Sequence, residues 1–205
     1  MSIKYELTDE TKNFCGITLH RIRALRDIPS VKVKSGDLGG WIEKENNLTQ
    51  YGDAWVCGDA KVHGNAMVYG DAKVCDDAMV YDNARVFGDA EVYGYAWVFG
   101  DARVYGYARV CSNARVCSDA WVCGGAEVCG NADYMTFKNS WSSGRWFTYT
   151  RSNKMWKVGC FYGSGDELIK KAYADSELSG KCYEAIVRAT ETIEAAKSEA
   201  KGGAR

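Results

Sequence analysis

Few residues in this chain have the chemistry of a catalytic group. Two histidines, His20 and His63, could act as general bases near neutral pH. No nucleophile elbow, phosphate-binding glycine loop or carboxylate pair accompanies them. His20 lies in an alternating segment, TLHRIRAL, and His63 occupies a repeat position that elsewhere carries aromatic residues. We therefore expect both histidines to be structural and predict no catalytic residue.

The nine cysteines suggest metal or disulfide chemistry. They lack C-x-x-C spacing and no secretory signal precedes them, so we expect reduced thiols. Two pairs, Cys57 with Cys75 and Cys111 with Cys129, share a column of the repeats described next. Two thiolates alone do not complete a tetrahedral zinc site, so the sequence predicts no metal.

Composition excludes several partners. The net charge of −1 provides no field that would attract nucleic acid or an anionic membrane. No apolar run approaches the ~20 residues of a membrane helix, and the N-terminus has no apolar signal core. We expect a cytoplasmic protein that binds neither nucleic acid nor membrane.

The chain is dominated by one hexapeptide. From Gly52 to Met135 it runs through 14 hexads without an insertion. The third residue is Ala in all 14 and the fifth is Val in 13. The second residue is Asp or Asn in 11 and the first is Gly in 10. Such regularity is typical of a repeat architecture.

The period itself predicts the fold. Ala and Val, two residues apart, point to one side of an extended strand, and residues four and six point to the other. The Gly-Asp and Gly-Asn pairs favour corners because they tolerate positive φ. The chain must then coil, with each short strand stacked ~4.8 Å from an equivalent one. Asp53, Asp71 and Asp89 form one column of acidic corner residues, and each is expected to cap its own backbone rather than to bind calcium.

Three segments carry a resemblance to a known family. The phrase V-x-G-[D/N]-A-x resembles the hexapeptide repeat of left-handed parallel β-helix proteins, although Cys, Tyr, Phe or His often follows Val here instead of Gly. The segment LHRIRALRDIPSVKVKSGDLGGWIEKENNLTQYGDAWV resembles the N-terminal cap of bacterial and prophage-encoded hexapeptide-repeat proteins, often described as acyltransferases. GCFYGSGDELIKKAYAD resembles the small C-terminal domain of phage-borne members. The resemblance implies the fold and a phage or prophage origin.

The same resemblance implies one enzymatic alternative. In hexapeptide acyltransferases, a histidine at a subunit junction deprotonates the acceptor, and acyl-CoA lies along the coils of a trimer. Here that role would fall to His63, with acyl-CoA as the cofactor. The uninterrupted hexads provide no extruded loop to shape an acceptor site. A second alternative is a pocket that sequesters a nucleotide signal at a subunit seam.

Taking every third hexad sorts the outward residues by face. One face alternates charge from Lys73 through Glu91 and Arg109 to Glu127, which predicts cross-strand ion pairs. The other two faces carry aromatic ladders that either tile the sheet or form a contact surface. The candidate binding residues are Tyr69, Phe87, Tyr105, Arg85, Arg103, Trp121, Trp97, Phe99 and Tyr81.

The two ends differ from the repeats. Residues 1–51 are expected to form a β-rich cap, residues 52–135 the β-helix, and residues 136–205 an α+β module of strands followed by two helices. Ser164 and Glu167 form a capping-box signature for the first helix, and the second is expected after Gly180. Candidate binding residues in this module are Trp141, Trp146, Trp156 and Arg145.

Together these observations predict a mainly β protein: a left-handed parallel β-helix with a β-rich cap and an α+β C-terminal module. We expect a non-enzymatic, rigid scaffold of phage or prophage origin without a cofactor. It would act by protein–protein contact or self-association, and could inhibit a host or defence protein.

Overall fold

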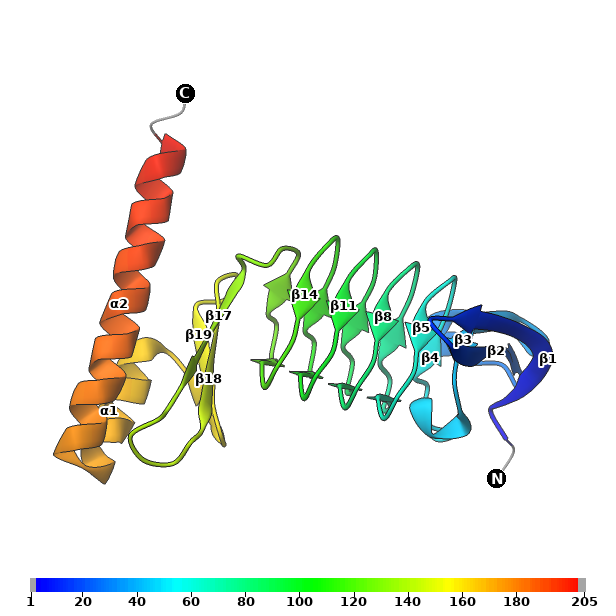
Figure 1. Cartoon of the computed structure of the whole chain (residues 1–205), viewed down its shortest axis with the longest axis horizontal. Helices are drawn as coiled ribbons and strands as arrows, with labels where there is room; N and C mark the ends of the chain where they lie inside the picture. Colours follow the sequence, from blue (N-terminus) through cyan, green and yellow to red (C-terminus); the bar gives the residue numbers. More distant parts are fainter. Residues whose placement is uncertain (1–2, 203–205) are drawn as a thin grey trace. The chain divides into compact units, whose positions relative to one another are not determined.

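The computed structural model describes residues 3–202 and is mainly β, with stacked parallel coils and two C-terminal helices (Figure 1). The chain divides into two compact units. The first comprises Met1–Met135 with Thr150–Asn153, and the second comprises Thr136–Tyr149 with Lys154–Arg205. The parallel β-helix and the C-terminal α+β module that the sequence predicts are confirmed.

The coils are built from 13 two-residue strands, one per hexad. Each strand pairs in parallel with the strand three hexads away, as Glu91 does with Lys73 and Arg109. Three sheets result, which we call the first, second and third faces. The first face contains β4 (Trp55–Val56), β7 (Lys73–Val74), β10 (Glu91–Val92), β13 (Arg109–Val110) and β16 (Glu127–Val128). The second contains β5 (Lys61–Val62), β8 (Met79–Val80), β11 (Trp97–Val98) and β14 (Arg115–Val116). The third contains β6 (Met67–Val68), β9 (Arg85–Val86), β12 (Arg103–Val104) and β15 (Trp121–Val122).

The core of the coils consists of the repeated Ala and Val side chains. From Ala54 to Val128, every third-position Ala and fifth-position Val is at most 1% exposed. From Gly52 to Gly124, the first residue of each hexad turns the corner in the left-handed conformation, as Gly70 does with φ 72°. A Cβ on Gly70 would lie 2.9 Å from the Gly88 nitrogen, so close stacking of coils favours glycine there.

Corner side chains bond to the next coil. The Asp71 carboxylate accepts a hydrogen bond from the backbone nitrogen of Asp53 at 3.1 Å. The Asn65 amide donates to the Asn83 side-chain oxygen, and the Asn83 amide donates to the Asp101 carboxylate, each at 3.2 Å. The corner side chains therefore bond polar groups of the neighbouring coil. The prediction that Asp71 caps its own backbone is wrong, since its carboxylate bonds the Asp53 nitrogen one coil away.

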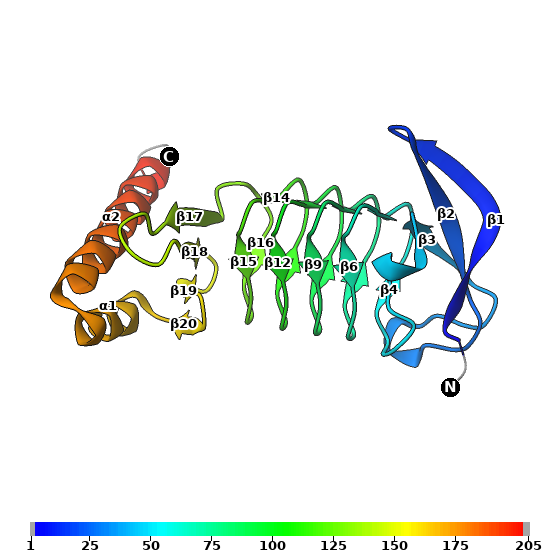
Figure 2. The ribbon, with the colours of Figure 1, turned by 60° about the horizontal axis from the view of Figure 1, so that its bottom comes forward.

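The N-terminal segment closes one end of the coils. Strands β1 (Tyr5–Phe14) and β2 (Ile17–Ala24) form an antiparallel hairpin, and β2 pairs with β3 (Leu38–Ile42) (Figure 2). Strand β3 then runs parallel to β5, with Ile42 fully buried in the same core. Short 3-10 helices, η1 (Pro29–Val31) and η2 (Glu45–Asn47), complete this segment.

Stacking therefore begins before the first hexad. Leu48 bridges to Val68 and is fully buried, so Ile42 and Leu48 form part of an earlier coil. They are six residues apart but out of phase with the later hexads, because Leu48 and Val56 are separated by eight residues. That shift hides the earlier coil from a search for strict hexads.

At the other end, the last hexad leaves the coil. Ala132 is exposed, and the Asp133 carboxylate accepts hydrogen bonds from the Cys129 and Gly130 nitrogens at 3.0 and 2.8 Å. This local turn replaces the coil corner. Tyr134, which stands where other hexads have Val, instead begins β17 (Tyr134–Lys138).

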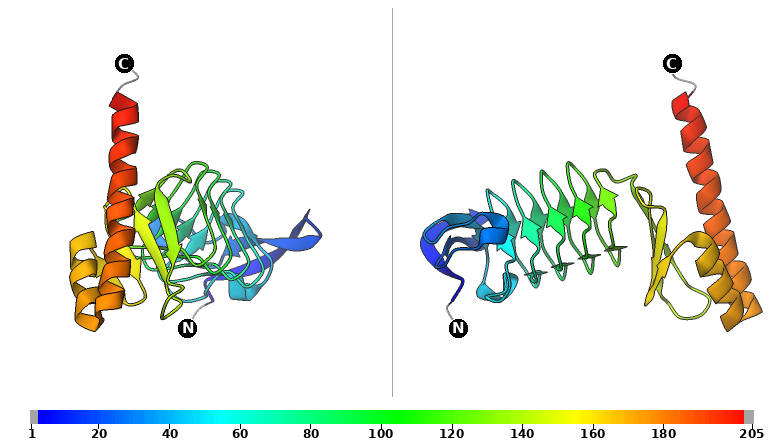
Figure 3. Two further views of the ribbon diagram at one scale, coloured as in Figure 1. Left: turned by 60° about the vertical axis from the view of Figure 1, so that its left-hand side comes forward. Right: turned by 180° about the vertical axis from the view of Figure 1, so that it is seen from behind.

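The C-terminal module is a four-stranded sheet followed by two helices. Its strands, in sheet order, are β17, β18 (Trp146–Thr150), β19 (Met155–Val158) and β20 (Phe161–Gly163). Helix α1 (Gly165–Asp175) begins at the predicted Ser164 capping box, and α2 (Glu177–Gly202) follows it (Figure 3). Residue Gly180 lies inside α2 rather than before it. A Cβ there would lie 2.2 Å from the Tyr173 ring, so this glycine permits close packing of the helices.

No helix in the described part of the chain is long and apolar enough to cross a membrane.

Candidate functional site

The third face carries a continuous stack of aromatic rings. The Tyr69 and Phe87 ring centroids are 4.8 Å apart, those of Phe87 and Tyr105 are 4.9 Å apart, and both pairs are within 2° of parallel. Trp121 meets Tyr105 edge-on at 6.4 Å. Strands β6, β9, β12 and β15 stack one coil apart (Figure 2). Tyr69, Phe87 and Tyr105 each directly follow one of these strands, whereas Trp121 lies within β15, in register with Arg103. All four rings are half-buried, so their outer parts reach solvent.

Beside this stack runs a column that contains two neighbouring arginines. Arg85 pairs in register with Arg103, and Arg103 with Trp121. The Arg103 guanidinium lies 4.5 Å from the Trp121 ring centroid, a cation–π contact. Within residues 3–202, neither arginine forms an ion pair. Like charges on opposed strand positions are destabilising, so folding alone does not account for this pair.

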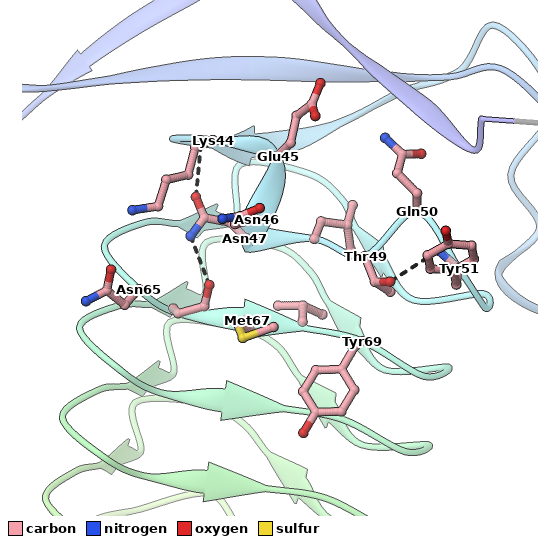
Figure 4. A pocket seen from close by; sticks show the side chains of 13 residues that line it. Lys44, Glu45, Asn46, Asn47, Thr49, Gln50, Tyr51, Asn65, Met67 and Tyr69 are labelled. Carbon is pink, nitrogen blue, oxygen red and sulfur yellow. Dashed lines mark hydrogen bonds between the residues drawn. The ribbon is translucent and has the colours of Figure 1, made fainter.

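The arginine column borders one hollow, and a second hollow adjoins the first. A cavity of about 370 Å³ is lined by Asn65, Met67, Asn83, Arg85, Asp101 and Arg103. A larger cavity of about 630 Å³ lies between residues 44–51 and 65–69 (Figure 4). Asn65 and Met67 line both, so the hollows adjoin at the N-terminal end of the third face. Met67 is 41% exposed there.

One wall of the larger cavity is held in place by a buried asparagine. The Asn47 amide donates to the Ala66 carbonyl at 2.9 Å, and its oxygen accepts from the Lys44 nitrogen at 2.9 Å (Figure 4). Asn47 is fully buried, so this wall is fixed to the coil beneath it. Sequence reasoning missed this wall because residues 44–51 do not follow the hexad pattern.

The second face has a similar ladder, with His63 at one end. The ring centroids are 5.2 Å apart between His63 and Tyr81 and 5.0 Å apart between Tyr81 and Phe99, with the rings nearly parallel. Trp97 meets Tyr81 edge-on and lies under the Arg115 guanidinium at 4.4 Å. Here a single arginine caps one ring, and the column has no opposed pair of arginines.

His63 is packed between aromatic rings. Phe14, from the hairpin, approaches it at 5.8 Å on the side opposite Tyr81 in the ladder. Burial lowers the pKa of His63, which favours the neutral imidazole. The nearby carboxylates of Glu43 and Asp82 accept hydrogen bonds from the Gly64 and Gly100 nitrogens. No side chain among residues 3–200 hydrogen-bonds the His63 ring, so no carboxylate there orients it as a base. His20 lies half-buried in β2, opposite Thr11 and Ile42.

The first face is internally compensated. The Lys73 ammonium lies 3.5 Å from a Glu91 carboxylate oxygen, and the Arg109 guanidinium lies 3.4 Å from the other. These two ion pairs of the predicted alternation are confirmed. Trp55, at the N-terminal end of the column, is only 1% exposed and packs edge-on against Tyr5.

The expectation that all cysteines are reduced is wrong for four of them. Disulfides join Cys57 to Cys75 and Cys111 to Cys129, each between adjacent coils of the first face. In-register stacking brings their Cα atoms within 4.6 and 4.5 Å, respectively. The signal in the sequence was a separation of 18 residues, one full coil. The free cysteines are Cys15, Cys117, Cys123, Cys160 and Cys182.

The aromatic residues of the C-terminal module mainly form its core. Trp156 is 2% exposed and packs edge-on against Phe147, so it is a core residue and not part of a binding surface. Trp141 is half-buried against Phe147, and its indole nitrogen is buried without a hydrogen-bond partner. Trp146 is half-buried under the Lys138 ammonium, and Arg145 is exposed. These residues do not form an open aromatic face like the third face.

Comparison with protein-family models and with curated protein sequences finds no match for this chain.

Proposed function

We propose that this protein is a non-enzymatic, rigid scaffold that binds another protein through its third face. The observation that carries the proposal is the opposed pair Arg85 and Arg103, without ion pairs in the described chain, beside the stack of Tyr69, Phe87 and Tyr105. Like charges on opposed strand positions destabilise the fold, so the presence of this arginine pair on one face supports a role in binding.

The chemistry of the face indicates the chemistry of the partner. Aromatic residues and arginines are enriched at protein interfaces and at their energetic hot spots. Two adjacent guanidinium groups suit carboxylates, which they can bind through paired charge-assisted hydrogen bonds. The partner surface would therefore present acidic side chains flanking apolar ones. The adjoining hollows at Met67 would receive a protruding side chain.

A second copy of the chain fits the third face less well. A two-fold symmetric contact uses the same patch on both copies. It would bring two positively charged arginine columns into one interface, where desolvated like charges repel. Self-association through this face is therefore the competing outcome of the test and not the proposal.

The resemblance of the chain ends to phage-borne hexapeptide-repeat proteins supports a setting. We place the protein in the cytoplasm of an infected or lysogenic bacterium. Its partner there would be a host protein, and a defence protein is a specific candidate. This part of the proposal rests on the resemblance alone.

The test compares two matched substitutions at the sixth hexad position. Tagged wild-type protein, Phe87→Glu on the third face and Tyr93→Glu on the first face would be used to capture proteins from bacterial lysate. We expect wild type and Tyr93→Glu to retain one partner that Phe87→Glu loses. Circular dichroism should show that all three proteins are folded.

Molar mass by light scattering completes this test. A monomeric wild type agrees with the proposal. Retention of the partner by Phe87→Glu would contradict it, as would a wild-type multimer that Phe87→Glu dissociates, because a second copy would then occupy the face.

A further inference from the structure

A cluster of metal-binding residue types lies on the first face, away from the proposed binding surface. Cys111 and Cys129 occupy adjacent coils, and Glu127 precedes Cys129 by two residues on the same strand side. Their ligand atoms all lie within 4.8 Å of one another. The Cys129 sulfur lies 3.6 Å from a Glu127 carboxylate oxygen.

We propose that Cys111, Cys129 and Glu127 form a redox-gated site for a thiophilic divalent cation of the Zn²⁺ class. In the structure the two cysteines are joined as a disulfide, which occupies both sulfurs. Reduction would free two thiols next to a carboxylate. Two thiolates and one carboxylate provide three ligands of a tetrahedral site, and water completes it.

A dithiol reductant gives two electrons and two protons to the Cys111–Cys129 disulfide, whose S–S bond breaks, and the reductant becomes a disulfide itself. The cation then displaces the two thiol protons to solvent and binds both thiolates and the Glu127 carboxylate. A disulfide oxidant that takes two electrons from the two thiolates and two protons from solvent, and so becomes a dithiol, would re-form the Cys111–Cys129 bond and release the cation.

The surroundings hold the ligands in place. Asp133 accepts a hydrogen bond from the Cys129 nitrogen at 3.0 Å, and the Ser152 hydroxyl accepts one from the Glu127 nitrogen at 2.7 Å. Cys111 is 3% exposed whereas Glu127 is exposed, so the site is buried on the Cys111 side and open to solvent on the Glu127 side. Arg109 lies in register with Glu127 on the neighbouring coil, and its guanidinium reaches Glu91 at 3.4 Å. Such backbone and outer contacts fix metal ligands.

The other disulfide is a natural control. Cys57 and Cys75 have the same one-coil separation, but Lys73 takes the place that Glu127 has beside Cys129. An ammonium group there repels a cation and offers no ligand. Within the described chain, the three-ligand cluster occurs only at Cys111, Glu127 and Cys129. The sequence-based prediction of no metal considered the two thiols alone and did not include Glu127 as a ligand.

The test uses Cd²⁺ as the probe with the reduced, metal-free full chain. Binding is followed by the ultraviolet thiolate-to-cadmium charge-transfer band. We expect the double variant Cys57→Ser/Cys75→Ser to keep the tightest binding step of wild type. The double variant Cys111→Ser/Cys129→Ser should lose that step. Because the free cysteines are common to both, the difference between the variants isolates the site.

A single surface substitution guards against misfolding. Glu127→Gln keeps both thiols and the size of the exposed side chain. It should lower the affinity for Cd²⁺ by at least ~tenfold. Oxidised wild type should lack the tight step. Equal Cd²⁺ affinity in the two double variants, or an unchanged affinity in Glu127→Gln, would overturn the proposal without bearing on the third face.

Discussion

The first and third faces share one backbone and one core but differ in what they present outward. On the first face, the Glu91 carboxylate pairs with both Lys73 and Arg109, and two disulfides tie neighbouring coils. On the third face, Arg85 stands opposite Arg103 without an ion pair in the described chain, beside stacked rings and two hollows. Charged side chains of the first face thus pair with one another, whereas the two arginines of the third face form no ion pair in the described chain.

This difference separates stability from binding within a single repeat. Outward side chains at positions four and six lie mostly outside the Ala and Val core, with Trp55 as an exception, so most of each face can change without altering the coil. We infer that first-face residues contribute mainly to the free energy of unfolding, and that third-face residues contribute mainly to partner affinity. The following substitutions test that division.

The largest effect on stability is expected from a first-face disulfide. In the oxidised protein, Cys57→Ser removes a cross-link that spans 18 residues and should lower the free energy of unfolding by about 3 kcal/mol. Urea denaturation measures this, with Cys160→Ser, at a free exposed cysteine, as the control. Equal midpoints for the two variants would show that the cross-link does not stabilise the coils.

Charge reversal on the third face should reduce affinity rather than stability. Arg85→Glu would place a carboxylate opposite Arg103, which adds ~0.2–1 kcal/mol to stability. It should weaken partner binding at least ~tenfold, or about 1.4 kcal/mol. Thermal unfolding and titration of the captured partner measure the two effects. Lower stability with unchanged affinity would reverse the assignment of this face.

The matching charge reversal on the first face should do the opposite. Glu91→Arg removes both ion pairs and creates a run of three like charges with Lys73 and Arg109. Stability should fall by ~1 kcal/mol at low salt and recover in high salt, because these half-exposed charges are screened. Partner affinity should stay unchanged. A salt-independent loss would mean that packing, and not charge, connects these coils.

The smallest effect is expected from the second face, through pH. Burial lowers the pKa of His63, so the unfolded chain binds a proton at a higher pH than the folded chain. Stability contributed by the neutral ring is present above the ordinary pKa of ~6.5 and is lost as pH falls through the lower folded value. His63→Phe should reduce that acid sensitivity, which denaturation at several pH values measures. An unchanged pH profile would contradict a packed, neutral His63.

Much of this architecture follows from counting in the sequence. The columns of both aromatic ladders were predicted because a hexad repeat without insertions fixes which side chains stack. The coil formed by Ile42 and Leu48 was missed because a two-residue shift breaks the period. The disulfides were missed because the sequence argument weighed cellular compartment and C-x-x-C spacing over the one-coil separation of Cys57 and Cys75.

The candidate site was predicted less completely than the fold. Arg85, Arg103 and the rings of the third face were expected on one surface, which is where they lie. The hollows beside them depend on residues 44–51, whose path is set by single contacts such as those of Asn47. Non-repeating contacts of this kind leave no periodic signal. Trp156 shows the converse, since its residue type suggested binding whereas its burial places it in a core.

Site-specific photo-crosslinking inside bacterial cells tests most directly whether a partner protein binds to the third face. A photoreactive phenylalanine analogue would replace Phe87 on the third face or Tyr93 on the first face, with crosslinked peptides identified by mass spectrometry. We predict crosslinks from position 87 to an acidic segment of one other protein, and none from position 93. Equal crosslinking from both positions, or crosslinks from position 93 alone, would contradict the assignment of binding to the third face.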